Sequence, residues 1–141
     1  MTARLRRIRG DQVGAVAMEF ALVAPTFLMF IFLILDGGRM LFFKQSLNEV
    51  AAAAARCYAI QAQGCTSVTN TQDWAVARGL ARDNLKLSTR DVVITTTSCN
   101  GIANMARAQI SATWQKGAMT LLPQSVAPST LTSTACYPIA A

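Results

Sequence analysis

Histidine is absent from the 141-residue chain, and so is a glycine-rich loop of the kind that binds phosphates. General acid–base catalysis most often uses histidine or a pair of carboxylic acids. The acids Asp73, Asp83 and Asp91 are far apart in the sequence and occupy positions typical of helix starts and turns, and no serine has a plausible base. The sequence therefore predicts a protein that is not an enzyme and that needs no cofactor.

Charged residues are also few, at 14% of the chain, with a formal net charge of +6. Residues 1–14 carry +3 of this charge, from Arg4, Arg6, Arg7 and Arg9 against Asp11, which leaves nine basic and six acidic side chains downstream. Beyond residue 14 no arginine or lysine cluster is interleaved with aromatic residues. We therefore predict no binding to nucleic acid.

The chain has only four cysteines, Cys57, Cys65, Cys99 and Cys136. They contain no CxxC spacing, and without histidine they do not predict a metal site. An even number of cysteines in an exported domain predicts disulfides, with three possible pairings. We favour Cys57 with Cys65, a spacing short enough to join a helix end to the next loop, and Cys99 with Cys136, which would join two strands. In the loop-entropy model the two closures contribute roughly 2.5 and 4 kcal/mol.

What the sequence does contain is one long apolar run, from Ala15 to Leu35, whose only charged residue is Glu19. As a helix this run is about 31 Å long, enough to cross a bilayer core of roughly 30 Å. The arginines before it place the N-terminus in the cytoplasm. A carboxylate in hydrocarbon costs about 2.5 to 3.5 kcal/mol, so Glu19 needs a partner. A peptidase cut after Gly14 would supply one, because the new ammonium of Ala15 would lie about one turn from Glu19 or beside the Glu19 of a neighbouring subunit.

The segment Gly14 to Phe20 places an acid fifth after a glycine, with an aromatic residue next. It resembles the processing site of prepilins, which are cut at the cytoplasmic face of the membrane, here between Gly14 and Ala15. A side chain at Gly14 would crowd a peptidase site that must accept backbone closely. Pro25 removes one backbone hydrogen bond, which predicts a kink or loosening near Ala21 to Pro25, and a tolerated membrane proline is the alternative.

The wider sequence resembles the TadE-like minor pilins, or pseudopilins, of tight-adherence (Tad) pili, a type IV pilus system. The cysteine layout fits this family, as do three stretches and the C-terminal ending: Ala21–Pro25, Asp36–Arg39, the alanine-rich run to Cys57, and Leu131–Pro138. One departure is Asp36 before Gly37-Gly38, where the family pattern has a bulkier residue. This departure predicts a looser helix at that point.

The resemblance implies a role in pilus assembly, cell adhesion or secretion, in which Glu19 draws a subunit into register and Phe20 to Leu35 pack against lipid or other subunits. The implied partners are a prepilin peptidase, the inner-membrane assembly platform, the major pilin, other minor pilins and membrane lipid. The protein would cross the bacterial inner membrane once, with a cytoplasmic N-terminus and a periplasmic C-terminal domain, and could enter the extracellular pilus. The alternative is an unprocessed, signal-anchored envelope protein with a binding domain.

We expect four segments: a leader removed from residues 1–14, a transmembrane helix over 15–36, its extension over 37–63, and a small α+β domain over 64–141. The extension should bury one face and continue to about Ala62, with Gly37-Gly38 as a possible hinge. That face recurs every three or four residues, at Phe43, Leu47, Val50, Ala54 and Cys57.

The small domain should contain a second helix over Asp73–Leu87, capped by Asn70 or Thr71. Its buried face would carry Trp74, Ala77, Ala81 and Leu85. Three strands should follow, over Val92–Thr97, Ala106–Gln115 and Thr130–Tyr137, with Asn100-Gly101 turning between the first two. The predicted fold is a three-stranded antiparallel sheet with one apolar face against the helices.

Overall fold

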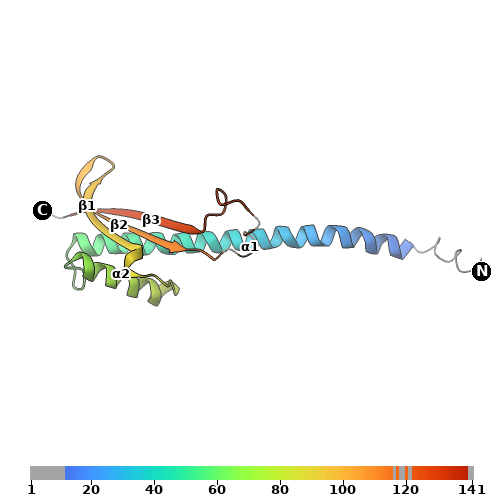
Figure 1. Ribbon diagram of the computed structural model, residues 1–141, viewed down its shortest axis with the longest axis horizontal. Coiled ribbons are helices and arrows are strands. Elements are labelled where there is room, and N and C mark those ends of the chain that lie inside the picture. Colours follow the sequence, from blue (N-terminus) through green and yellow to red (C-terminus); the bar gives the residue numbers. More distant parts are fainter. Residues whose placement is uncertain (1–11, 116, 118–119, 121, 140–141) are drawn as a thin grey trace, which may run out of the picture.

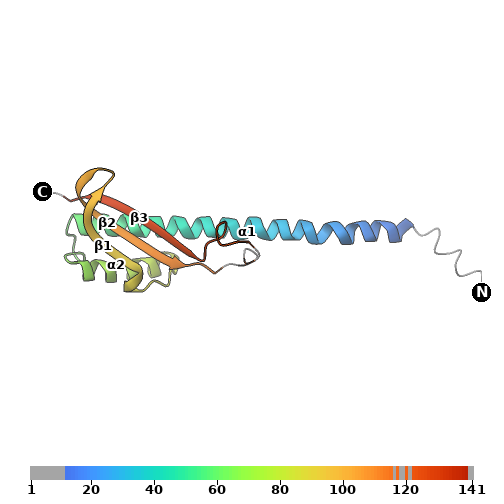
Figure 2. The ribbon, with the colours of Figure 1, turned by 45° about the horizontal axis from the view of Figure 1, so that its top comes forward.

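A computed structural model describes residues 12–115, 117, 120 and 122–139. Its longest element is α1 (Gln12–Ala59), a single helix of 48 residues, or about 72 Å at 1.5 Å per residue. The N-terminal half of α1 projects away from all other elements, and the C-terminal half carries the sheet and the second helix (Figure 1, Figure 2). The predicted leader falls mostly outside the described residues.

The helix α1 continues without interruption through Pro25 and through Gly37-Gly38, so the expected loosening and hinge do not appear as breaks. Each glycine inside a helix costs about 1 kcal/mol relative to alanine. Met40 and Phe43, which follow this glycine pair, pack against the core and offset that cost. The helix ends at Ala59, slightly before the predicted Ala62.

The second helix, α2 (Val68–Asp83), begins and ends earlier than predicted. Its N-cap is Ser67, whose Oγ accepts a hydrogen bond from the backbone N–H of Asn70 at 3.2 Å, so the prediction of a cap at Asn70 or Thr71 was wrong. Most residues in the first turn are polar, so the apolar pattern used for the prediction starts only after the helix has begun. At the other end, Asn84 adopts a left-handed conformation (φ 51°) and closes the helix.

The face that α2 buries also differs from the predicted one. Thr71, Ala75 and Gly79 point into the protein, whereas Ala77 and Ala81 are exposed. Trp74 is half-buried and packs against the core, as expected, and Leu85 is buried just beyond the helix. The earlier start explains the error, because the buried face begins at Thr71 and recurs every four residues from there.

The sheet matches the prediction. After a short 3-10 turn, η2 (Thr89–Asp91), the strands β1 (Val92–Cys99), β2 (Ile102–Thr113) and β3 (Thr130–Pro138) form an antiparallel sheet in the order β1-β2-β3. Asn100 (φ 51°) and Gly101 (φ 82°) make the two-residue turn between β1 and β2.

The core lies between the sheet and the C-terminal half of α1. Alternate residues of β2 are buried, namely Ala106, Ala108, Ile110 and Ala112. They face Leu47, Val50 and Ala54 on the predicted apolar face of α1, all of which are buried. Small side chains on both elements let the helix and the sheet approach closely, so the observed architecture is the predicted α+β layer.

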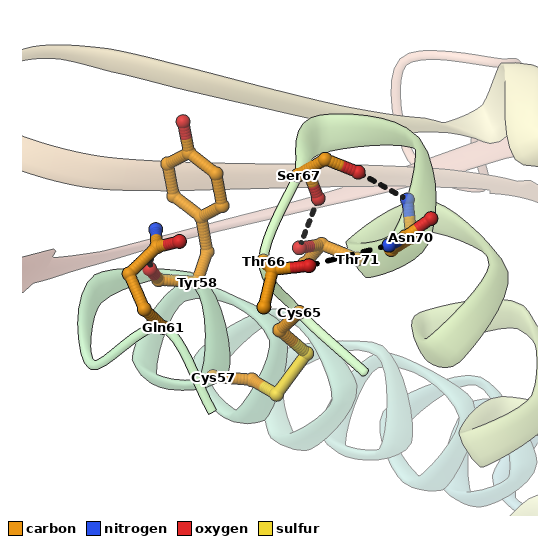
Figure 3. The surroundings of a disulfide bond; sticks show 8 residues. All are labelled: Cys57, Tyr58, Gln61, Cys65, Thr66, Ser67, Asn70 and Thr71. Carbon is orange, nitrogen blue, oxygen red and sulfur yellow. Dashed lines mark hydrogen bonds between the residues drawn. A yellow bond between two sulfur atoms is a disulfide. The ribbon is translucent and has the colours of Figure 1, made fainter. Parts of the chain in front are cut away.

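Two disulfides close the domain, Cys57 with Cys65 and Cys99 with Cys136, which is the favoured pairing. Figure 3 shows the first, which links the last turns of α1 to the loop that leads into Ser67 and α2. In the first turn of α2, Thr71 Oγ1 donates a hydrogen bond to the carbonyl oxygen of Ser67 at 2.7 Å. The disulfide and the cap therefore fix the entry to α2 from both sides.

Candidate membrane and assembly site

The projecting half of α1 exposes an almost continuous apolar surface. It is long and apolar enough to cross a membrane, with a mean hydropathy of 2.3 over its most apolar window and none of that window buried. Phe20 is 72% exposed and Leu22 is 73% exposed. A soluble monomer rarely exposes so large an apolar patch, so this surface requires lipid or other protein chains.

Glu19 interrupts this surface between Met18 and Phe20, and its side chain is exposed. Among the residues whose side chains the structure describes, none gives the Glu19 carboxylate a hydrogen bond or an ion pair. Glu19 lies five residues after Gly14, a rise of about 7.5 Å along the helix. The geometry therefore leaves the carboxylate available to a group from outside the described chain or from a new N-terminus.

Gly14 lies in the first turn of α1, and a side-chain carbon built on it would meet no other atom within 4 Å. The fold therefore does not need glycine at this position. A requirement for glycine here would have to come from a protein that binds this turn.

A second polar feature, which we did not predict, lies where α1 meets the domain. Asp36 is only 8% exposed although it follows directly after the apolar run. The loop from β2 to β3 covers it, because a side-chain carbon on Gly117 would lie 2.5 and 2.7 Å from the two carboxylate oxygens. Arg39 Nη1 is 3.8 Å from Asp36 Oδ1 on the exposed side.

Two aromatic rings complete this feature. The guanidinium carbon of Arg39 is 5.9 Å from the centre of the Trp114 ring, and the Trp114 ring is 5.5 Å from that of Phe43. We call this group the Asp36 cluster, consisting of Asp36, Arg39, Phe43, Trp114 and Gly117. The signal in the sequence was the unexplained acid after the apolar run, but no spacing rule links it to a loop about 80 residues later.

The predicted site residues fall into two separate places. Gly14, Ala15, Glu19, Phe20 and Pro25 all lie on the projecting half of α1, whereas the four cysteines lie in the domain. Glu19 and Cys57 are separated by about 57 Å along the helix axis. The disulfides therefore stabilise the domain and take no direct part in contacts of the projecting helix. Within the described residues, no group of three His, Cys, Asp or Glu residues is placed to hold a metal ion.

Part of α1 matches a known protein family. Residues 14–56 match the family described as TadE-like protein. We call residues 14–56 the TadE-like segment because of this similarity. Searches of curated proteins and of solved structures gave no significant match. The TadE-like segment starts at Gly14 and ends one residue before Cys57, so it covers the projecting helix and the core-facing part of α1, and it includes neither α2 nor the sheet.

Proposed function

We propose that the protein is a minor pilin, or pseudopilin, of a Tad pilus. It would be made as a precursor, cut after Gly14 by a prepilin peptidase, and assembled through α1. One observation carries this proposal: the TadE-like segment begins at Gly14 and coincides with an exposed apolar helix that carries a single acid. The family match associates the chain with the Tad pilus, and the processing, orientation and assembly steps are our inferences.

In this proposal the arginines of residues 1–14 hold the N-terminus in the cytoplasm, and α1 crosses the inner membrane once. The α+β domain then lies in the periplasm, where an oxidising environment allows both disulfides to form and persist. A domain of this size has a small core, so the two disulfides supply an important part of its stability.

Assembly depends on the projecting half of α1. Removal of residues 1–14 creates an ammonium at Ala15, which would neutralise Glu19 in the same chain or in a neighbouring subunit. In hydrocarbon an unpaired carboxylate is costly, so the helix would be most stable at the position where this charge is paired. Phe20 to Leu35 would then pack against the major pilin and other minor pilins, after delivery by the assembly platform.

The absence of histidine and of paired acids favours a structural role over catalysis. The alternative proposal keeps the membrane helix but not the processing: an uncut, signal-anchored envelope protein whose domain binds another component. In that case Glu19 would need a different partner.

The N-terminal sequence and intact mass of the membrane-extracted protein separate the two proposals. The protein would be isolated from cells with and without the prepilin peptidase. A terminus at Ala15 that depends on the peptidase supports the pilin proposal. A terminus at Met1 or Thr2 in both strains refutes processing and leaves the signal-anchored protein.

A further inference from the structure

The exposed apolar surface of α1 does not end at Leu35, where the uncharged run of the sequence ends. About two turns further on, Leu41 is 70% exposed and Phe42 is 78% exposed. Phe42 is the most exposed large hydrophobic side chain among the described residues. Its own domain covers the opposite face of the helix at this level, where Phe43 and Leu47 pack inward. A surface contact outside the chain must therefore account for Leu41 and Phe42.

The length of the apolar surface limits where the membrane lies. From Val16 to Phe42 the helix rises about 40 Å, which exceeds a hydrocarbon core of roughly 30 Å and is close to the thickness of a bilayer with its headgroups. Two placements of the core are possible, one over residues 15–35 and one over about residues 20–40. The first leaves Glu19 inside the hydrocarbon, and the second moves it to the inner boundary.

The two placements differ in which acid they bury. In the first placement Glu19 enters hydrocarbon as an exposed carboxylate. In the second placement Asp36 comes to the same depth from the outer side, but the protein already shields it, with Gly117 against the carboxylate and Arg39 at 3.8 Å. Transfer from water into hydrocarbon costs less free energy for a shielded and paired acid than for an exposed one. The second placement is therefore the more stable one for a single subunit.

The charges near residue 40 also suit the outer headgroup region. Arg39 and Lys44 are exposed, whereas Asp36, the only acid between Leu35 and Asn48, is buried. Long basic side chains beside apolar ones are typical of membrane boundaries, because the stems lie along the apolar surface and the charged ends reach the lipid phosphates. The domain contacts α1 close to this level, where Gly117 lies against Asp36.

We propose that the outer boundary of the membrane lies at residues 39–42, so that Leu41 and Phe42 insert into the lipid of the outer leaflet. The Asp36 cluster at the base of the α+β domain then spans this boundary, with Asp36 and Gly117 on its membrane side. Before assembly Glu19 lies at the inner boundary, and a subunit must move along its helix axis to bring Glu19 into a hydrocarbon environment. This inference rests on the membrane insertion of the proposed function, and it is independent of processing and of pilus assembly.

Spin labels test this placement on the full, purified chain in vesicles of phosphatidylethanolamine and phosphatidylglycerol. All four native cysteines are in disulfides, so a new cysteine at Phe42→Cys takes the label, and the intact mass confirms that both disulfides remain. Leu28→Cys serves as the mid-membrane reference. Ile60→Cys is the matched control, because Ile60 is 53% exposed and lies about 27 Å beyond Phe42 along the axis of α1, on the side away from the membrane. Leu41→Cys provides a second label at the boundary.

The measured quantity is the ratio of collision rates with oxygen, which concentrates in lipid, and with a water-soluble nickel chelate. We expect a ratio at residues 41 and 42 that lies between the ratios at 28 and 60 and is clearly above that at 60. A ratio at 42 as low as that at 60 overturns the proposal and returns the boundary to Leu35. Low collision rates with both reagents, together with spin–spin broadening that disappears on dilution with unlabelled chain, identify a second copy as the occupant and also overturn it. Neither result depends on where the N-terminus is cut, so failure here and failure of the pilin proposal are distinguishable.

Discussion

Gly117 lies against Asp36 so closely that a side-chain carbon on the glycine would be 2.5 Å from one carboxylate oxygen. The contact joins the loop after β2 to the helix about 80 residues earlier, at the point where α1 leaves the domain. It explains how a carboxylate directly after an apolar run can be buried, and it gives glycine a specific role at this position.

Replacing Gly117 by alanine should therefore destabilise the domain. The added carbon must push the loop away from Asp36, and overpacking of this kind costs about 1 to 3 kcal/mol. The free energy of unfolding in detergent, measured with urea, would show the loss. Gly38→Ala is the matched control, because a carbon there meets no atom within 4 Å, and it should be neutral or stabilise the helix by up to about 1 kcal/mol. In an Asp36→Ala background the Gly117→Ala cost should shrink, and an unchanged cost would show that the contact is not its cause.

The N-cap of α2 gives a second prediction. Ser67→Ala removes the hydroxyl that accepts from the N–H of Asn70, and it should lower the free energy of unfolding by about 1 kcal/mol. Asn70→Ala tests the cap suggested by the sequence, and it should cost less than about 0.5 kcal/mol because its side chain makes only an exposed contact. Ser67→Asp should retain most of the stability. A larger loss for Asn70→Ala than for Ser67→Ala would place the cap where the sequence suggested.

Local patterns predicted most of this fold. The alternation in β2, the turn at Asn100-Gly101 and the apolar face of α1 each depend on neighbours within a few residues, and all three are confirmed. The start of α2 was wrong because several polar residues compete for the cap position, and only the fold selects Ser67. The sequence favoured the Cys99–Cys136 pairing but did not predict how the two strands meet. In the structure β2 lies between β1 and β3, the strands that carry these cysteines. A register shift between Thr97 and Cys99 accompanies the approach of the two Cα atoms to 6.5 Å.

In the candidate site, too, some residues were predicted from the sequence and others were not. The apolar run and Glu19 were visible in the sequence, because membrane helices follow a simple rule of length and polarity. The Asp36 cluster was not, because it depends on where the chain between β2 and β3 passes α1. The sequence also did not predict the exposure of Phe42. The spacing of apolar residues predicts that Phe43 faces the domain, but it does not show where along α1 the other face is left uncovered by the domain.

Processing should be sensitive to Gly14 and insensitive to a matched glycine in the leader. Because a side chain at Gly14 meets nothing in the fold, Gly14→Leu should leave insertion and unfolding unchanged. It should nevertheless stop the peptidase-dependent cut, leaving a chain heavier by residues 1–14 in the mass spectrum. Gly10→Leu should be cut normally. A mature Gly14→Leu protein with Ala15 at its terminus would contradict the assignment of the processing site.

The role of Glu19 is the most direct test of assembly. Glu19→Ala removes a charge from an exposed position of the projecting helix, so insertion should be retained or improved, by up to about 3 kcal/mol if the acid enters hydrocarbon. Pili should nevertheless be lost, because no charge remains to pair with the Ala15 ammonium and fix the subunit in register. Met18→Ala is the matched control, at a neighbouring side chain that is 71% exposed, and it should assemble. Counting surface pili by electron microscopy, with membrane fractions probed in parallel for the protein, separates assembly from insertion. Normal piliation of the Glu19→Ala strain would refute the role, whereas loss in both strains would assign the effect to packing of the helix surface.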